Sequence, residues 1–212
     1  MMNVPVLLFD LDGTLVETTE ISISIIQEAI RQYPELPVTD AKTIRSAFGL
    51  PKKEFWDLLV PEGDENQRLA IQEEWEKKVI TEIHKNNVLM PFAKEVLAEL
   101  KSRGYILSTA SNCTSAYLNG VLDSQEIRDY FEQPLCLETV QGHRKEEILI
   151  EHFKRLDREN AYMIGDRSTD IEAAHAQGVP AVACHFGYAD EKELEAAEHH
   201  IHSLRDLLRI FK

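Results

Sequence analysis

Residues 4–14 read VPVLLFDLDGT, a short apolar run that ends in two aspartates and a glycine. An apolar run of this length that begins with β-branched residues is typical of a buried strand, and the residues after it predict a tight loop. Side chains alternate along a strand, so Asp10 and Asp12 would point the same way if the strand continued. The stretch therefore predicts a pair of carboxylates at the mouth of a buried strand.

Three further apolar runs read as short strands that end in polar residues: residues 105–110 before Ser111, residues 161–164 before Gly165-Asp166, and residues 179–184 before Gly187. Helical patterns lie between these runs, at residues 93–103, 146–156 and 170–177. Strands that alternate with helices of this length form parallel crossover units. The order of elements thus predicts an α/β fold whose parallel sheet is covered on both faces.

Polar residues follow the ends of these strands. They are Asp10, Asp12, Ser111, Asp166 and Asp170. In open α/β sheets, ligands bind beyond the carboxyl ends of the strands. We therefore expect the fold to gather these side chains from distant parts of the sequence into one site.

The stretch from residue 17 to residue 87 has a different pattern, because it lacks a clear strand and carries helical periodicities. This predicts a core domain made of residues 1–16 and 88–212, interrupted by an all-helical domain at residues 17–87. Trp56 and Trp75 lie in the helical part, where their spacing favours packing between helices over ligand stacking.

Composition excludes several classes of protein. The chain has 212 residues, 43% of them hydrophobic, and its 23 basic and 37 acidic residues give a net charge of −14, which argues against nucleic acid as a partner. Three cysteines without a CxxC pair favour reduced thiols, and no uncharged stretch approaches the roughly 18 residues of a membrane span. The N-terminal run meets an aspartate and has no basic flank, unlike a signal peptide. We expect a cytoplasmic protein with no membrane partner.

The two aspartates of the first loop can divide the work of a reaction. One carboxylate can attack an electrophile covalently, while the other protonates the leaving oxygen and later deprotonates a water molecule. An Asx-type loop at a strand end, without catalysis, is the structural alternative for Asp10 and Asp12.

Asp166 and Asp170 lie in GDRSTD, residues 165–170, and bring more negative charge to a neighbouring strand end. So many carboxylates need a compensating charge, and a hard cation such as Mg²⁺ takes oxygen ligands of this kind. Asp10 and Asp166 suit that role. Asp170 has an alternative as a helix N-cap, and it could do both.

A phosphate group could be bound by residues near the second strand and by a basic residue. Ser111 and Asn112 could offer a hydroxyl and backbone N–H groups to an anionic oxygen. Lys145 could neutralise a phosphate or the attacking carboxylate. A solvated surface lysine is the alternative, and Arg144 next to it competes for the same role.

The strings DLDGT and GDRSTD, with a serine after the second strand and a downstream lysine between them, stand in the order of four motifs. In this the chain resembles the haloacid dehalogenase-like hydrolase superfamily, in particular its phosphoglycolate phosphatase-like subgroup. The resemblance spans residue 6 to about residue 188. It implies a doubly wound, Rossmann-like parallel sheet with an all-helical cap domain inserted after the first motif, at residues 17–87.

The same resemblance implies roles for the acidic residues. Asp10 would be the nucleophile that forms an aspartyl-phosphate, and Asp12 the general acid and base. The Mg²⁺ ligands would be Asp10, the backbone carbonyl of Asp12, and Asp166, with Asp170 supporting the water shell of the metal.

The resemblance places the phosphate-binding hydroxyl at Ser111, with Thr109 as a competitor, makes Lys145 the cation of the third motif, and has Thr14 assist the loop. We expect Thr14, Ser111, Asn112 and Lys145 to bind the phosphate. Similar cap domains present a specificity loop where this chain has Gly49-Leu50-Pro51-Lys52. Lys52 is therefore a candidate for contact with the substrate, and Arg45 is a second one.

The function implied is a magnesium-dependent phosphatase that hydrolyses a small phosphomonoester, phosphoglycolate-like or a sugar phosphate. Its partner would be a small phosphorylated metabolite. Asp12 disfavours the dehalogenating and phosphonate-cleaving branches, which lack an acid at that position. The alternatives are a phosphosugar mutase on the same core, a pyrophosphatase, and a non-catalytic binding protein.

Overall fold

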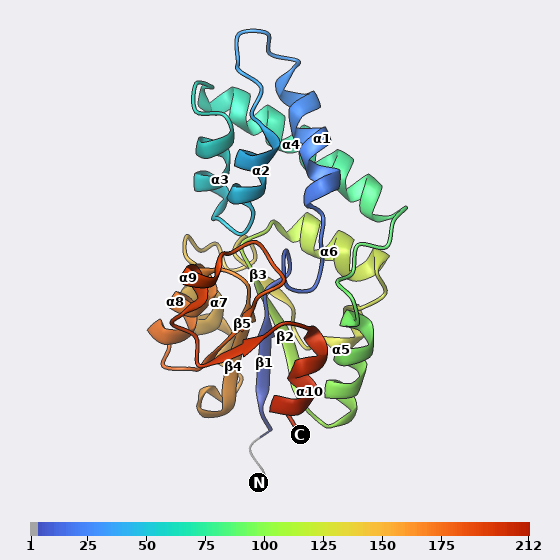
Figure 1. Cartoon of the computed structure of the whole chain (residues 1–212), viewed down its shortest axis with the longest axis vertical. Helices are drawn as coiled ribbons and strands as arrows, with labels where there is room; N and C mark the ends of the chain where they lie inside the picture. Colours follow the sequence, from blue (N-terminus) through green and yellow to red (C-terminus); the bar gives the residue numbers. More distant parts are fainter. Residues whose placement is uncertain (1–3) are drawn as a thin grey trace.

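The computed structural model describes residues 4–212. Residues 1–3 lie outside the described part. The prediction that the N-terminal run is no signal peptide falls partly on them. A parallel sheet of six strands forms the centre of the molecule, in the order β3-β2-β1-β4-β5-β6 (Figure 1). The strands are β1 (Val6–Phe9), β2 (Ile106–Ser111), β3 (Leu135–Cys136), β4 (Ala161–Gly165), β5 (Ala181–Cys184) and β6 (His199–Ile201).

Helices cover both faces of the sheet (Figure 1). They are α5 (Ala93–Ser102), α6 (Ser115–Ser124), α7 (Lys145–His152), α8 (Ser168–Ala176), α9 (Glu191–Leu194) and α10 (Leu207–Ile210), with short 3-10 turns η1 (Arg128–Tyr130), η2 (Arg158–Asn160) and η3 (Leu204–Asp206). The central strand β1 shows why both faces need a cover. Leu7 and Phe9 pack into one hydrophobic cluster, and Val6 and Leu8 into another. The predicted α/β fold with a parallel sheet is confirmed.

The structure has two strands that the sequence did not predict. Strand β3 contains two residues, too few to show an alternating pattern, and β6 contains His199 and His200, which made the segment read as polar. Helices α2 and α6 were missed as well. The predicted strand at residues 4–11 is shorter in the structure, because the chain has left the sheet by Asp10.

Four helices between β1 and α5 form a separate layer beyond the carboxyl ends of the strands (Figure 1). They are α1 (Thr19–Ile30), α2 (Ala41–Ala47), α3 (Lys52–Leu59) and α4 (Glu65–Ile83). We call residues 19–83 the helical insert, and the remainder the core. The insert has a hydrophobic cluster of its own, centred on buried residues such as Ile26, Ile44 and Leu59. Its position places it directly over the edge where ligands bind in such sheets.

Two chain segments that run side by side connect the core to the helical insert. Glu17 N donates to Val88 O at 2.8 Å, and Met90 N donates to Leu15 O at 2.8 Å. Buried Gln125 of the core holds the second segment: its Oε1 accepts from Val88 N, and its Nε2 donates to the carbonyl oxygens of residues 83 and 86. The connection therefore consists of two paired backbone segments, and the side-chain amide of Gln125 holds one of them against the core.

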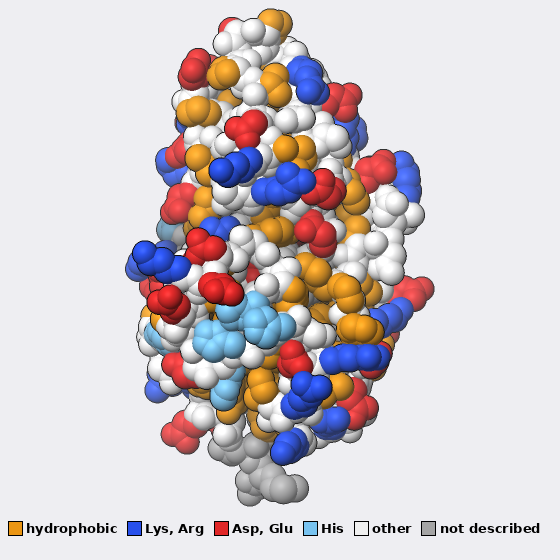
Figure 2. Space-filling model, in the orientation of Figure 1, with side chains coloured by type: hydrophobic (Ala, Val, Ile, Leu, Met, Phe, Trp, Pro, Cys, Tyr) orange, Lys and Arg blue, Asp and Glu red, His pale blue; other side chains and the backbone are white. Residues whose placement is uncertain are grey.

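Acidic and basic side chains are interspersed on the face drawn in Figure 2, and a patch of histidines lies on the core. His185 and His200 are in contact there, with 2.9 Å between ring nitrogens. Within residues 4–212, no helix combines the length and the apolar character that crossing a membrane requires.

Candidate active site

The loop after β1 is built around a close approach to Asp166. Asp10 N donates to Ile164 O at 2.8 Å, which holds the loop against the neighbouring strand. Gly13 has φ +79°, and a Cβ there would lie 2.3 Å from Asp166 Oδ2. Only glycine allows this conformation at this distance. The DLDGT motif thus shapes a backbone turn that lies against a carboxylate of another strand.

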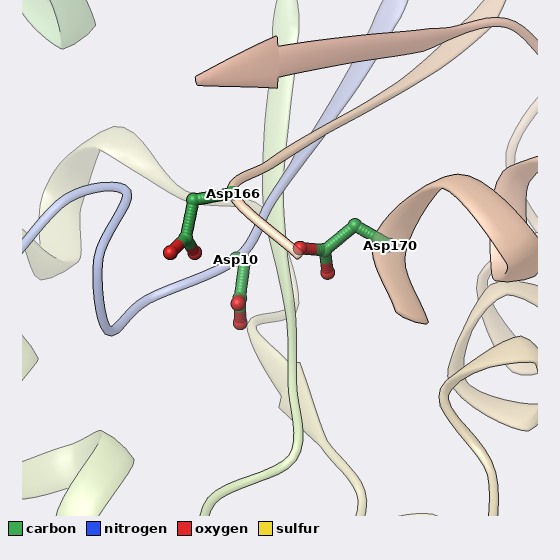
Figure 3. Close-up of side chains that lie close together, drawn as sticks. All are labelled: Asp10, Asp166 and Asp170. Carbon is green, nitrogen blue, oxygen red and sulfur yellow. The ribbon is translucent and has the colours of Figure 1, made fainter. Parts of the chain in front are cut away.

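Asp10, Asp166 and Asp170 converge in space (Figure 3), and one carboxylate oxygen of each lies within 4.8 Å of the others. All three are buried. They come from the loop after β1, the end of β4 and the first turn of α8. The structure therefore confirms the prediction that the fold brings these three aspartates together.

Hydrogen bonds from neighbouring groups hold two of the three carboxylates, those of Asp166 and Asp170, in position. Tyr188 N donates to Asp166 Oδ2 at 2.6 Å, and Thr14 Oγ1 donates to Asp166 Oδ1 at 3.3 Å. Arg167 N donates to Asp170 Oδ2 at 2.9 Å. The hydroxyl of Thr14, predicted to bind phosphate, is thus engaged by a carboxylate.

The alternative that Asp170 is a helix N-cap is wrong. Helix α8 begins at Ser168, so Arg167 is the N-cap residue, and Asp170 stands in the first turn. Its carboxylate accepts from the N-cap backbone while also meeting Lys145, so it supports the helix and the site together.

Lys145 supplies the positive charge among the carboxylates. Its Nζ lies 3.1 Å from Asp10 Oδ1 and forms an ion pair with Asp170 as well. Lys145 is buried at the start of α7, whereas the side chain of Arg144 is exposed and pairs with Glu146 at 3.3 Å. Of the two basic neighbours that sequence could not separate, the structure brings Lys145 to the acids.

The protonation of this cluster reflects an excess of negative charge. Burial raises the pKa of Asp10, and burial together with the neighbouring Asp10 and Asp170 raises the pKa of Asp166 well above its ordinary value. Burial, partly offset by Lys145, raises the pKa of Asp170 to about 6. One ammonium does not compensate three buried carboxylates, and all-oxygen donors suit a hard divalent cation. The donor set therefore fits Mg²⁺ chemically.

Asp12 lies beside this cluster, in a different setting. Tyr117 OH donates to its Oδ1 at 2.6 Å, and Thr18 Oγ1 donates to the same atom at 3.0 Å. Burial raises the pKa of Asp12 to about 6, although both hydrogen bonds lower it. Sequence reasoning missed Tyr117 and Thr18. The available signal was weak: Tyr117 follows Ser111 in a helix that was not predicted.

The end of β2 separates the two predicted hydroxyl candidates. Thr109 Oγ1 donates to Leu135 O at 2.9 Å and is used within the sheet. Ser111 is buried, accepts weakly from Cys113 N at 3.4 Å, and lines a cavity that Asp10 and Asp12 also line. Ser111 is thus the one positioned to meet a ligand beside the acids.

We call this space, enclosed between the core and the helical insert, the central cavity. The core contributes Asp10, Asp12, Ser111, Asn112 and Tyr117 to its lining. Asn112 also connects the two layers, because its Nδ2 donates to the carbonyl oxygen of residue 49 at 2.9 Å.

The two predicted substrate contacts of the insert lie in different places. Lys52 lines the central cavity but is exposed, so it stands at the rim. Arg45 does not line it. Its guanidinium pairs with Glu20 beside a separate hollow that Glu17 and Tyr188 line.

Arg167, next to Asp166, was not predicted to have a role. Its Nη1 donates to the carbonyl oxygens of Ser46, at 3.3 Å, and Phe48, while its Nε donates to Glu193 Oε1 at 2.7 Å. The GDRSTD segment therefore contacts the insert as well as the acidic cluster.

Known proteins resemble this chain along nearly its whole length. A sequence model of the family described as haloacid dehalogenase-like hydrolase matches residues 7–184. A protein named "Probable phosphatase IndB" from Dickeya dadantii is 30% identical over 202 residues, which cover 92% of this chain and 86% of that protein. A phosphoglycolate phosphatase from Caulobacter vibrioides is 28% identical, over 97% of this chain and 90% of its own.

Solved structures share the architecture. A structure described as a predicted phosphoglycolate phosphatase from Haemophilus somnus superposes with a TM-score of 0.86 at 23% identity, covering 100% of both chains. A β-phosphoglucomutase from Clostridium difficile has a TM-score of 0.80 at 20% identity, over 96% of this chain and 93% of that one. At these identities the structures establish the fold, while the sequence matches carry the family. The chain therefore belongs to the haloacid dehalogenase-like hydrolases, within their phosphoglycolate phosphatase-like subgroup.

Proposed function

We propose that the protein is a magnesium-dependent phosphatase that hydrolyses a small phosphomonoester through an aspartyl-phosphate on Asp10. The observation that carries the proposal is the contact of Asp10 with Lys145 beside Asp166, because Asp10 also lines the central cavity together with Asp12. The names of the relatives, phosphatase and phosphoglycolate phosphatase, support the same reaction.

In the first step, a carboxylate oxygen of Asp10 would attack the phosphorus atom, and the bond from phosphorus to the leaving oxygen would break. Asp12 would give its proton to that oxygen, so that a neutral alcohol departs. In the second step, Asp12 would take a proton from a water molecule, whose oxygen attacks the phosphorus and restores the Asp10 carboxylate. A pKa of about 6 suits Asp12 to both proton transfers near neutral pH.

The remaining residues would neutralise and orient the phosphoryl group, which is most of what phosphoryl transfer requires. Lys145 would stabilise negative charge on Asp10 and on the phosphoryl oxygens, and Ser111 would donate its hydroxyl to one of them. Asp10, Asp166, Asp170 and the backbone carbonyl of Asp12 would hold Mg²⁺, which supplies further charge neutralisation when bound.

The helical insert would act as a cap, with a domain boundary near residues 17 and 87 and a core of residues 1–16 and 88–212. Its separate hydrophobic cluster and its two-stranded connection support this division. A cap over the acids would exclude water while the substrate is bound.

The partner in this proposal is a small phosphorylated metabolite. We place the protein in the cytoplasm on the ground that Cys113, Cys136 and Cys184 are all unbridged.

The test is release of inorganic phosphate from a panel of phosphomonoesters, with Mg²⁺ and with EDTA. Wild-type protein should release phosphate only with metal, and Asp10→Asn should lose about 10⁵-fold or more, as removal of a nucleophile does elsewhere. Asp129→Asn, at an exposed site, is the matched control. Equal turnover by Asp10→Asn would refute the covalent mechanism. Phosphate retained on Asp10 without release would favour a mutase.

A further inference from the structure

Aromatic side chains make up much of the lining of the central cavity. The insert contributes Phe48, Phe55, Trp56 and Trp75, and the core contributes Tyr117. The rings are in contact: Trp75 lies 5.8 Å from Trp56 between centroids, and it stacks on Tyr117 at 6.0 Å with 22° between planes. A ligand that reaches from the acids toward the insert therefore meets ring faces and edges.

Positive charge is scarce in this lining. Among residues 4–212, Lys52 is the only lysine or arginine that lines the cavity, and it is exposed. Nearby cations have other partners, since Lys145 is paired with Asp10 and Asp170. Arg167 is paired with Glu193 at 2.7 Å. A leaving group with a carboxylate would lose water here without gaining a buried cation, which is costly.

Two buried polar atoms of the lining have no hydrogen-bond partner in the described structure: Trp75 Nε1 and Asn112 Oδ1. One is a donor and the other an acceptor. The amide nitrogen of Asn112 is already used by Gly49 O. Unpaired buried polar atoms are uncommon, and both of these belong to residues that line the cavity.

We propose that the phosphomonoester cleaved at this site releases a neutral alcohol that carries an aromatic ring, with the ring held against Trp75 and its neighbours. The inference rests on the proposed phosphatase function and narrows it. The proposed substrate differs from phosphoglycolate, which is named for several relatives, because the glycolate leaving group is small and anionic. Ring contacts add to apolar burial and favour aromatic over aliphatic groups of similar size.

The test compares kcat/KM for four alkyl phosphates, whose similar phosphate ester bonds limit differences in intrinsic reactivity. They are benzyl phosphate, cyclohexylmethyl phosphate, ethyl phosphate and phosphoglycolate. We expect benzyl phosphate to exceed ethyl phosphate and phosphoglycolate by about tenfold or more, and cyclohexylmethyl phosphate by several-fold. Higher kcat/KM for phosphoglycolate than for benzyl phosphate would overturn the inference, as would equal values for the two ring compounds.

A substitution at Trp75 tests whether the preference for benzyl over ethyl phosphate depends on the aromatic lining of the cavity. Trp75→Leu should reduce the ratio of benzyl to ethyl phosphate kcat/KM toward one, whereas Tyr33→Leu, which changes an aromatic residue of the insert outside the cavity, should keep it. An unchanged ratio in Trp75→Leu would contradict the proposed ring position. If Trp75→Leu does not fold, the substrate series on wild-type protein still decides. Absence of phosphate release from all four esters and from p-nitrophenyl phosphate would refute the phosphatase function itself, a result distinct from a reversed preference.

Discussion

The core and the helical insert meet at the central cavity, and they bring opposite kinds of chemistry to it. On the core side stand charged groups, each held by several partners, as Asp166 is held by Tyr188 N and Thr14 Oγ1. On the insert side stand aromatic rings that contact one another. In the proposed reaction, reactivity therefore depends on the placement of charge by the core, and substrate selectivity depends on apolar contact with the insert.

The two sides are joined by few polar contacts. Asn112 Nδ2 donates to the carbonyl of Gly49, Thr114 Oγ1 donates to Glu76, and Arg167 donates to two carbonyls of the insert. Ile25, Val79 and Ile83 of the insert also pack into the hydrophobic cluster of the core, so a change on one side should spare the property of the other where it leaves these contacts intact.

Lys145→Met should have the largest effect on the core side, because it removes the ammonium group that pairs with Asp10 and Asp170. Loss of the ammonium should reduce kcat by about 10³-fold, the scale of removing one charge-stabilising group, because Asp10 and the phosphoryl oxygens lose their positive partner. The reduction should be similar for every substrate, since Lys145 does not contact the aromatic lining. Steady-state kinetics on the four esters above measures this, with exposed Arg144→Met as control. A reduction that differs strongly between esters would contradict the separation of roles.

Gln125→Leu tests the connection between the two sides. Its amide serves Val88 N and the carbonyls of Ile83 and Asn86, so leucine leaves these buried groups unpaired. We expect the free energy of unfolding to fall by about 3 kcal/mol, and Tm by roughly 6–10 °C in a domain of this size. Thermal and urea unfolding measure the loss. Gln177→Leu, whose amide has no such contacts in the described structure, should cost less than about 0.5 kcal/mol.

The free energy of unfolding should depend on pH through the buried carboxyl of Asp12 on the core side. The pKa of Asp12 is about 6 in the folded protein and 3.8 ordinarily, so the folded state binds this proton more tightly. This contribution to stability is present at low pH and is lost as pH rises from about 4 to 6. In EDTA, Asp12→Asn should thus gain about 2 kcal/mol relative to wild type between pH 4.5 and pH 7. Urea unfolding at both pH values measures the difference, and a constant difference would contradict it.

Tyr117→Phe changes a residue that contacts both sides, because its hydroxyl donates to Asp12 and its ring stacks on Trp75. Phenylalanine keeps the ring and removes the donor. We expect kcat to fall by about tenfold for alkyl phosphates, as for one lost hydrogen bond to a charged group. The fall should be smaller for p-nitrophenyl phosphate, whose leaving group needs little protonation. Tyr130→Phe is the control, and an equal fall for both ester types would argue against a role through Asp12.

The core site was largely predictable from sequence, because the carboxyl ends of parallel strands meet at one edge. Asp10 and Asp166 lie on such ends, so their proximity follows from the order of strands. The choice between Arg144 and Lys145 did not follow, since it depends on how helix α7 is turned against the sheet. The contact between the rings of Tyr117 and Trp75 could not be predicted from the sequence either. They lie 42 positions apart in sequence, on the core and on the insert, and only the packing of the two layers brings them together.

Arg167 and Asp166 are neighbours in the chain but contact different parts of the molecule. The guanidinium of Arg167 reaches the carbonyls of Ser46 and Phe48 in the insert, while Asp166 lies among the acids. A shift of the insert relative to the core would therefore act directly on the residue next to Asp166. The positions of the insert and of this carboxylate are linked through a single peptide unit.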